Sequence, residues 1–112
     1  ADRYAELLKH LVDVPVLSPG ATSSWAQYVI KLPRGTGRAA LIQKMETAGI
    51  PTAIYYPIPM HQQIPYTQYP VSGCDLSVTM DLCERVLALP MHPYLEIGQQ
   101  EYIAANLEKA LT

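Results

Sequence analysis

Apolar residues recur at helical spacing in four stretches of the chain. In the first, Tyr4, Leu8 and Leu11 fall on one side of a helix, and Pro15 follows where the pattern stops. In the second, Thr36 is a suitable N-cap and Gly49 stands where a left-handed glycine often ends a helix. The pattern predicts helices over residues 2–12, 37–48, 76–86 and 98–111.

An alternating pattern of side chains predicts three short strands. The segment SSWAQYVIKL alternates between two faces and is rich in aromatic and β-branched residues. The segment IPTAIYY has the same character, with Pro51 at the first position, where a strand tolerates a missing N–H donor. The run VLALP is typical of a buried strand. We expect strands over residues 24–32, 51–56 and 86–90.

A proline-rich segment, YPIPMHQQIPY, follows the second of these strands and cannot continue it. Residues that precede proline are biased toward extended or polyproline backbone. We therefore expect a stiff, extended arm over residues 58–64, with a short turn at residues 61–63.

These elements predict one α+β domain that covers residues 1–112. The strands are too few and too short for a doubly wound sheet. A small, mostly antiparallel sheet with helices on one face fits the order of elements best.

The composition adds an expectation about surfaces. Hydrophobic residues make up 49% of the chain and charged residues 16%, whereas a typical soluble domain carries about 25% charged residues. The aromatic set contains eight tyrosines, one tryptophan and no phenylalanine, and tyrosine suits interfaces and the edges of ligand sites. Some apolar surface is therefore expected to meet a partner.

Charge and hydropathy exclude several classes of partner. The net charge is −2 and the basic residues are scattered, which argues against nucleic acid and acidic lipid. The apolar runs are too short to cross a bilayer, and the N-terminus lacks a signal-peptide pattern. We expect a soluble, cytoplasmic protein without membrane contact.

The two cysteines, Cys74 and Cys83, have none of the spacings of a zinc site. Free thiols in a reducing compartment are the favoured interpretation, and no metal site is expected.

The arm and the two tyrosines just before it carry the densest set of polar and aromatic side chains. Tyr55, Tyr56, His61 and Gln62 together offer phenols, an imidazole and an amide to a polar or planar ligand. The alternative is structural, with the tyrosines divided between core and surface and His61 capping a turn.

Two further motifs have a functional and a structural interpretation. His92, held by Pro93 at the end of a buried strand, is a second candidate, but a structural histidine that bonds to the backbone is the favoured interpretation. The segment RGTGR at residues 34–38 resembles a phosphate cradle at a helix N-terminus, but a turn followed by an N-cap has the same composition.

No catalytic grouping is visible. The chain has no nucleophile elbow, zinc-protease motif, P-loop or dinucleotide fingerprint. Asp75, Asp81 and Glu84 look like the solvated face of one helix. The lysines occupy polar positions, where the amine is expected to stay protonated. They are Lys9, Lys31, Lys44 and Lys109.

Three segments, SSWAQYVIKL, METAGIPTAIYYPIPMHQQIPY and RVLALPMHPYLE, form a familiar series. In order and spacing they resemble the C-terminal domain of the DegT/DnrJ/EryC1/StrS family of pyridoxal-phosphate-dependent sugar aminotransferases. The resemblance runs from RYAELL to ANLEKAL, nearly the whole chain.

The resemblance implies the small C-terminal domain of the aspartate-aminotransferase fold type I. In that family a large domain, absent from this chain, supplies the Schiff-base lysine that holds pyridoxal 5'-phosphate. The enzyme moves an amino group, from glutamate, to a nucleotide-linked keto-sugar, and works as a homodimer. No lysine of this chain matches the Schiff-base position, so the resemblance implies no catalytic residue here and no activity for the domain alone.

The family's small domain forms part of the substrate wall and of the dimer contact. By resemblance, Tyr55, Tyr56, His61 and Gln62 bind the nucleotide-sugar, and His92 is a second-tier candidate. Many relatives have histidine in place of Tyr55. Because a phenol carries no positive charge, a contact to diphosphate at this position would be weaker.

Two rival hypotheses remain open. The chain can be a stand-alone binding or assembly module that kept the fold without the chemistry. It can also be a small nucleotide-sugar binder that uses Tyr55, Tyr56 and His61.

Overall fold

The computed structural model describes residues 1–73 and 75–112, so the free thiol predicted at Cys74 lies outside the described residues. Cys83 is a free, half-buried thiol. The elements follow the order helix, strand, helix, two 3-10 turns, helix, strand, helix. Their bounds are α1 Asp2–Leu8, β1 Tyr28–Lys31, α2 Arg38–Thr47, η1 Met60–Gln62, η2 Ile64–Tyr66, α3 Ser77–Arg85, β2 Val86–Leu89 and α4 Ile97–Leu111.

The sheet consists of β1 and β2, paired antiparallel with Tyr28 opposite Leu89 and Ile30 opposite Leu87. Since side chains alternate along a strand, these four residues share one face of the sheet. All four are buried, and they form the core together with residues from three helices. The helical members include Tyr4 and Leu8 of α1, Leu41 and Met45 of α2, and Ile103 and Leu107 of α4.

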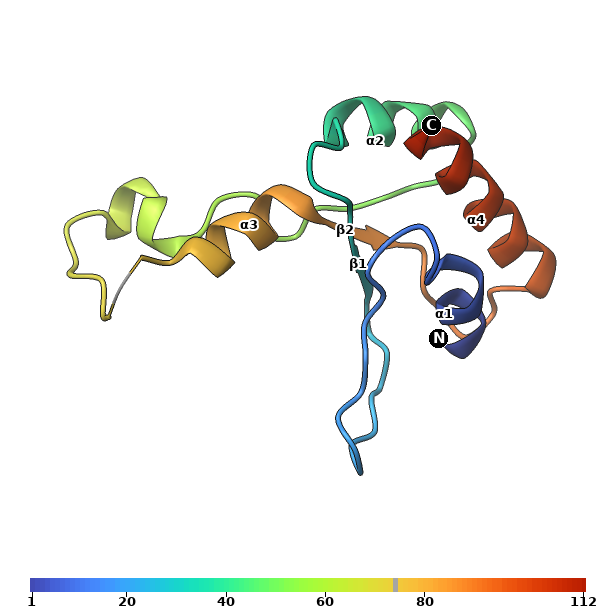
Figure 1. The fold of residues 1–112 in the computed structure, drawn as a ribbon, viewed down its shortest axis with the longest axis horizontal. Helices are drawn as coiled ribbons and strands as arrows, with labels where there is room; N and C mark the ends of the chain where they lie inside the picture. The colour runs from blue at the N-terminus through green and yellow to red at the C-terminus, as the bar shows by residue number, and fades with distance from the viewer. Residues whose placement is uncertain (74) are drawn as a thin grey trace.

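Helices α1, α2 and α4 therefore cover one face of the sheet, which confirms the α+β prediction (Figure 1). The second face carries Val29 and Ala88, which are paired across the strands. Ala53 joins this face through an isolated bridge to Ala88. We call this second side, lined by small side chains, the open face.

The ends of α2 show how the sequence defines a helix. Gly49 has φ +73°, and the N–H of Ile50 reaches the carbonyl of Met45 at 3.0 Å, while the N–H of Gly49 reaches Glu46 at 2.9 Å. These bonds form a Schellman motif, so the prediction for Gly49 was right. The predicted N-cap at Thr36 was wrong, because Gly37 is the N-cap and no side chain caps this end.

Three other predicted elements are shorter than their patterns suggested. The first helix ends at Leu8 instead of residue 12, because the chain turns so that Asp13 can pair with Lys31 on β1. The first strand starts at Tyr28 instead of residue 24, because Trp25 adopts φ +49°, outside the extended region. The strand predicted over residues 51–56 is reduced to the bridge at Ala53.

The arm is also different from the extended segment that the prolines predicted. Pro59 is extended, but the next residues form two successive 3-10 turns, η1 and η2, and the side chain of Gln63 donates to the carbonyl of Ile58 at 3.1 Å. The turn predicted at residues 61–63 is thus present, and a second one follows it. The arm is folded by its own local bonds.

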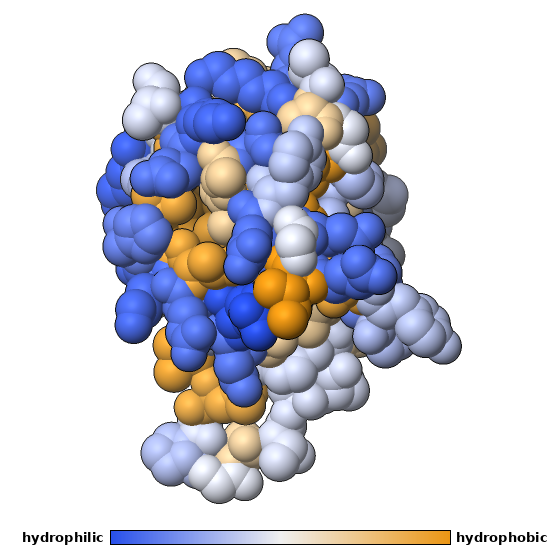
Figure 2. All heavy atoms as spheres, turned by 90° about the vertical axis from the view of Figure 1, so that its right-hand side faces the viewer, coloured by the Kyte–Doolittle hydropathy of each residue, from blue (hydrophilic) through white to orange (hydrophobic). Residues whose placement is uncertain are grey.

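The arm and α3 project together from one end of the molecule (Figure 1). We call residues 55–73 and 75–85 the lobe, and the sheet with α1, α2 and α4 the body. At the opposite end, over α4, the surface is mostly hydrophilic with a few hydrophobic patches (Figure 2). No helix among the described residues is long and apolar enough to span a membrane.

Candidate functional site

A hollow of about 210 Å³ lies on the open face, at the base of the lobe. Pro51–Ala53 and Tyr55 form one side, and Ala88 and Met91 the other. Ala26 and Gln27, which precede β1, complete the wall. We call it the Tyr55 hollow. Alanine side chains, Ala26, Ala53 and Ala88, form part of its lining.

Of the four residues predicted to bind a ligand in and before the arm, Tyr55 alone belongs to the lining of this hollow. Its side chain is 53% exposed and that of Tyr56 is 75% exposed. His61 is half-buried on η1 and Gln62 is exposed beside it. Tyr56, His61 and Gln62 line neither this hollow nor the one around His92, so the structure does not gather the four predicted residues in one pocket.

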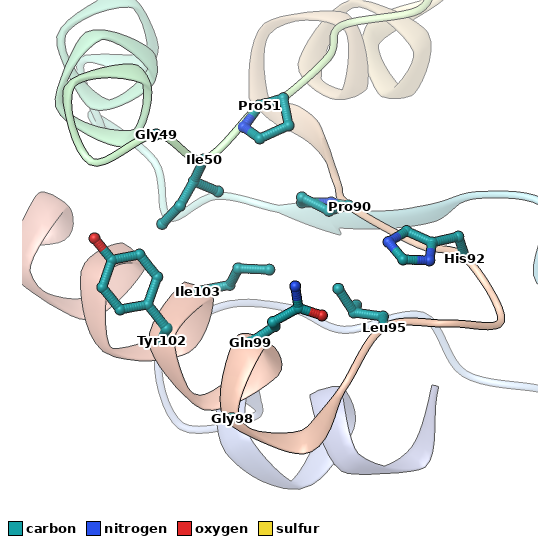
Figure 3. A pocket seen from close by; sticks show the side chains of 10 residues that line it. All are labelled: Gly49, Ile50, Pro51, Pro90, His92, Leu95, Gly98, Gln99, Tyr102 and Ile103. Carbon is teal, nitrogen blue, oxygen red and sulfur yellow. The ribbon is translucent and has the colours of Figure 1, made fainter.

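A second hollow, of about 360 Å³, lies on the other side of Pro51 and Pro90 and contains His92 (Figure 3). Ile50, Leu95 and Ile103 give it apolar walls. We call it the His92 hollow.

Structural bonds already occupy two polar groups of the His92 hollow. Tyr102 donates its hydroxyl hydrogen to the carbonyl of Ala48 at 3.1 Å. The side-chain oxygen of Gln99 accepts from the N–H of Glu96 at 2.9 Å, as half of the capping box that begins α4. The Gln99 amide nitrogen and the His92 ring face the interior (Figure 3). The turn here is closed by the backbone carbonyl of His92, which accepts from Leu95 at 3.2 Å, whereas we expected its side chain to bond back.

The arginines of the RGTGR segment do not form a phosphate cradle. Arg38 donates to carbonyls at the end of α3, and Arg34 forms an ion pair of 2.8 Å with Asp81. Asp81 also pairs with Arg85 at 2.8 Å, so this carboxylate is a structural partner and not a solvated one as predicted.

None of the four lysines fits attachment of pyridoxal 5'-phosphate. Lys31 is paired with Asp13 at 2.8 Å, and this ammonium lowers the pKa of the Asp13 carboxyl. Lys44 donates to the carbonyl of Ala110, and Lys9 and Lys109 are exposed. No lysine lines the Tyr55 hollow or the His92 hollow. In the described part of the chain, no three His, Cys, Asp or Glu side chains gather as a metal site.

Sequence reasoning missed Gln27, Thr52 and Met91 as lining residues of the Tyr55 hollow. Gln27 could have been predicted from the sequence, because it alternates with Tyr28 and so belongs on the same face as Val29. Thr52 and Met91 lie in irregular backbone, where no periodicity marks the direction of a side chain.

What the Tyr55 hollow offers is a contact surface. It has an aromatic ring, a phenol hydroxyl, an amide and apolar side chains, but no group placed to act as nucleophile or base. Such a surface can hold a planar or sugar-like ligand whose chemistry takes place on residues elsewhere.

Comparison with known proteins agrees with the family resemblance seen in the sequence. The model of the DegT/DnrJ/EryC1/StrS aminotransferase family matches residues 1–108. A UDP-N-acetyl-3-dehydro-alpha-D-glucosamine 3-aminotransferase from Acidithiobacillus ferrooxidans is 37% identical over 112 residues, which is 96% of this chain and 28% of that protein. This chain thus spans little more than a quarter of that relative's length.

Solved structures share the fold over the same portion. A DegT DnrJ EryC1 StrS aminotransferase from Brucella abortus is 40% identical with a TM-score of 0.90, over 98% of this chain and 29% of that one. NtdA from Bacillus subtilis, solved with bound cofactor PMP, is 28% identical with a TM-score of 0.76, over 98% of this chain and 26% of its own. Since the family match covers nearly all residues, the chain belongs to the DegT/DnrJ/EryC1/StrS aminotransferase family.

Proposed function

We propose that this chain is the small domain of a pyridoxal-phosphate-dependent aminotransferase that transfers an amino group from glutamate to a nucleotide-linked keto-sugar. Family membership supports the reaction class, and the relative from A. ferrooxidans is named for a UDP-linked keto-sugar. The four lysines are exposed or paired, so the Schiff-base lysine and the cofactor pocket belong to a large domain outside this chain. The domain alone is inactive.

The observation that carries this proposal is the open face with the Tyr55 hollow. Helices cover one side of the sheet, while the other side carries the half-buried Ala53, the half-exposed Tyr55 and, beneath them, the buried Ala88. A catalytic domain that packs against this face would enclose the hollow. The substrate would then bind between a reactive surface on the large domain and a passive wall on this one.

In this arrangement Tyr55 stacks on a ring of the nucleotide-sugar, and its hydroxyl bonds to a polar group of the ligand. The arm continues the wall with Tyr56, His61 and Gln62. Because the arm is pre-folded by its turns, less entropy is lost when the ligand orders against it. His92 lies in the second hollow and has a supporting role at most.

Binding of a stable sugar nucleotide tests this wall. In the full-length natural protein, UDP-N-acetylglucosamine serves as the ligand, and calorimetry gives its affinity. Tyr55→Ala is expected to weaken binding about tenfold, since one aromatic stacking contact is worth about 1–3 kcal/mol. Tyr55→Phe should retain most of the affinity if stacking dominates.

The matched control is Tyr94→Ala, which removes a tyrosine that is 85% exposed and lines neither hollow. Equal affinity in wild type and Tyr55→Ala would remove Tyr55 from the substrate wall. An equal loss in Tyr94→Ala would show that the effect is not specific to the hollow.

The lobe supports a further role in a homodimer. Ten of the fifteen exposed large apolar side chains in the described residues belong to it, including Ile64 at 89% and Val78 at 72% exposure. Exposed apolar surface of this extent is typical of interaction sites. The same observation favours the alternative function, a non-catalytic assembly module, which would dimerise without any amino transfer.

A further inference from the structure

The lobe meets the body at a narrow neck, where α3 runs into β2 without a loop. The helix ends at Arg85 and the strand begins at Val86. No residue of α3 is fully buried, so the hydrophobic core does not fix its direction. The direction of α3 must therefore depend on contacts at the neck.

Arg38 makes the first of these contacts. Its Nη1 donates to the carbonyl of Cys83 at 2.7 Å and to that of Val86 at 3.0 Å. The last carbonyls of a helix have no partner within the helix, and a cation near them is favourable. As the first residue of α2, Arg38 is in a poor position for its own helix, whose N-terminus repels positive charge. The bonds to the end of α3 explain why an arginine stands at this unfavourable position.

Arg85 makes the second contact. Its Nε donates to the carbonyl of Leu32 at 2.7 Å, and the N–H of Leu32 donates back to the carbonyl of Arg85 at 2.9 Å. The Arg85 guanidinium also binds Asp81 one turn earlier, and both side chains are largely shielded, at 16% and 20% exposure. Charge-assisted bonds of this length are among the stronger polar contacts in proteins. Arg34 adds only an outer ion pair, with 78% of its side chain exposed.

We propose that Arg38 and Arg85 form a clamp that fixes the angle of the lobe relative to the sheet, and that both are positioning residues for the substrate wall. Arg38 holds the end of α3 from the side of α2, and Arg85 holds it from the side of β1. The effect on substrate rests on the function proposed above. The clamp itself depends only on the bonds at the neck.

The two arginines are expected to set the orientation of the lobe without being needed for the folding of the body. Neither belongs to the hydrophobic core, so removing the Arg38 bonds should leave the core packed while the lobe changes its angle. Tyr55 lies at the base of the lobe and would move with it. Small misplacements of a binding group are costly, because a shift of about 1 Å can reduce activity by about a hundredfold.

The test uses the full-length natural protein with three variants. Arg38→Met keeps the aliphatic stem and removes the donors, and Arg38→Lys retains one cation that can reach a carbonyl. Arg34→Met is the matched control, since it removes an arginine from the same network without touching the clamp. Amide hydrogen exchange reports on α3 and α4 separately, and calorimetry with UDP-N-acetylglucosamine reports on the wall.

In Arg38→Met, we expect exchange in α3 to rise about tenfold while that in α4 stays constant, because local opening is independent of the core. The affinity for UDP-N-acetylglucosamine should fall about tenfold, with Arg38→Lys between wild type and Arg38→Met. Arg34→Met should stay within about twofold of wild type in both measurements.

Unchanged exchange in α3 of Arg38→Met, or an equal rise in Arg34→Met, would overturn the clamp. Faster exchange in α3 at unchanged affinity would overturn its link to the substrate wall. Should Arg38→Met not fold, the exchange rates and affinities of Arg38→Lys and wild type are compared instead, and they decide on the clamp in the same way. If the wild type binds neither UDP- nor dTDP-linked sugars, the proposed function fails, while the exchange data still decide on the clamp.

Discussion

At the scale of single residues, two neighbouring tyrosines with tilted rings differ in whether the buried hydroxyl has a hydrogen-bond partner. The rings of Tyr4 and Tyr28 lie 5.0 Å apart, and both residues are completely buried. The hydroxyl of Tyr4 donates to the carbonyl of Pro90 at 3.0 Å, which ties α1 to the end of β2. The hydroxyl of Tyr28 is buried without a partner among the described residues.

Replacing each tyrosine by phenylalanine should therefore have different consequences. Tyr4→Phe loses a hydrogen bond and leaves a carbonyl unpaired, so we expect the free energy of unfolding to fall by about 1 kcal/mol. Tyr28→Phe removes an unpaired polar atom, so stability should be unchanged or higher. Urea unfolding measures both, and an equal loss in the two variants would mean that the Tyr28 hydroxyl does have a partner.

The same pair predicts how stability depends on pH. Burial raises the pKa of Tyr4 and of Tyr28 to about 12, and the neighbouring Tyr28 and Asp2 add to the respective shifts. Since the unfolded chain ionises near the ordinary value of 10, the unfolded state loses its protons first. The contribution of these two tyrosines to stability should be constant below pH 10 and fall between pH 10 and 12. Unfolding curves across this range should show a smaller decline in the Tyr4→Phe, Tyr28→Phe double variant.

At the scale of elements, a glycine has a different role at the end of a helix than inside one. Gly49 ends α2 at φ +73°, and no atom lies within 4 Å of the position that a Cβ would occupy there, so any cost of substitution comes from the backbone alone. Gly98 lies in the first turn of α4 with equally open space and without a positive φ.

Gly49→Ala should destabilise the protein by about 1–2 kcal/mol, because an L-residue disfavours the left-handed conformation. Gly98→Ala should be neutral or stabilise by up to about 1 kcal/mol through its helix propensity. Thermal unfolding of the two variants tests the contrast. A stabilising Gly49→Ala would contradict the Schellman geometry at the end of α2.

Elements with a strong local signal were predictable from the sequence. The helix that became α4 was predicted within one residue of its start, because its apolar spacing and its packing against the sheet agree. The strand predicted at residues 24–32 failed at its first half, where the positive φ of Trp25 lets its ring lie 5.7 Å from that of Tyr28. Tyr102, an aromatic residue in the last helix, is 53% exposed and donates to the carbonyl of Ala48, the C-cap of α2. Tertiary contacts decided both cases, and no local pattern encodes them.

The candidate site was predictable only in part, for a similar reason. The resemblance indicated Tyr55, and the structure places it at the edge of a hollow. The opposite wall, with Ala88 and Met91, comes from a segment more than thirty residues away. Its position depends on strand pairing, which a single sequence does not reveal.

At the scale of the whole molecule, the shape deviates from that of a compact domain. The radius of gyration is 15.6 Å, against about 13 Å expected for a domain of this length. The lobe and the loop between α1 and β1 both extend from the body (Figure 1). The projecting lobe is also where the exposed apolar side chains gather, so its surface is suited to a partner.

A charge placed on the lobe tests the proposed dimer contact. Val78→Asp introduces a carboxylate on α3 at a side chain that is 72% exposed, so it should leave the fold intact. We expect the full-length protein to shift from dimer to monomer in light scattering. Glu108→Gln on α4, at the other end of the molecule, is the control. A dimer that persists in Val78→Asp would exclude this part of the lobe from the interface.

Amino transfer by the full-length natural protein is the most direct test of the central claim. The protein is incubated with pyridoxal 5'-phosphate, glutamate and UDP-N-acetyl-3-dehydro-alpha-D-glucosamine, and mass spectrometry follows the sugar product and 2-oxoglutarate. We predict that an amino sugar and 2-oxoglutarate form in equal amounts, and that the 112-residue chain alone forms neither. The account would be contradicted if the isolated chain catalysed the transfer, or if the full-length protein aminated no UDP- or dTDP-linked keto-sugar.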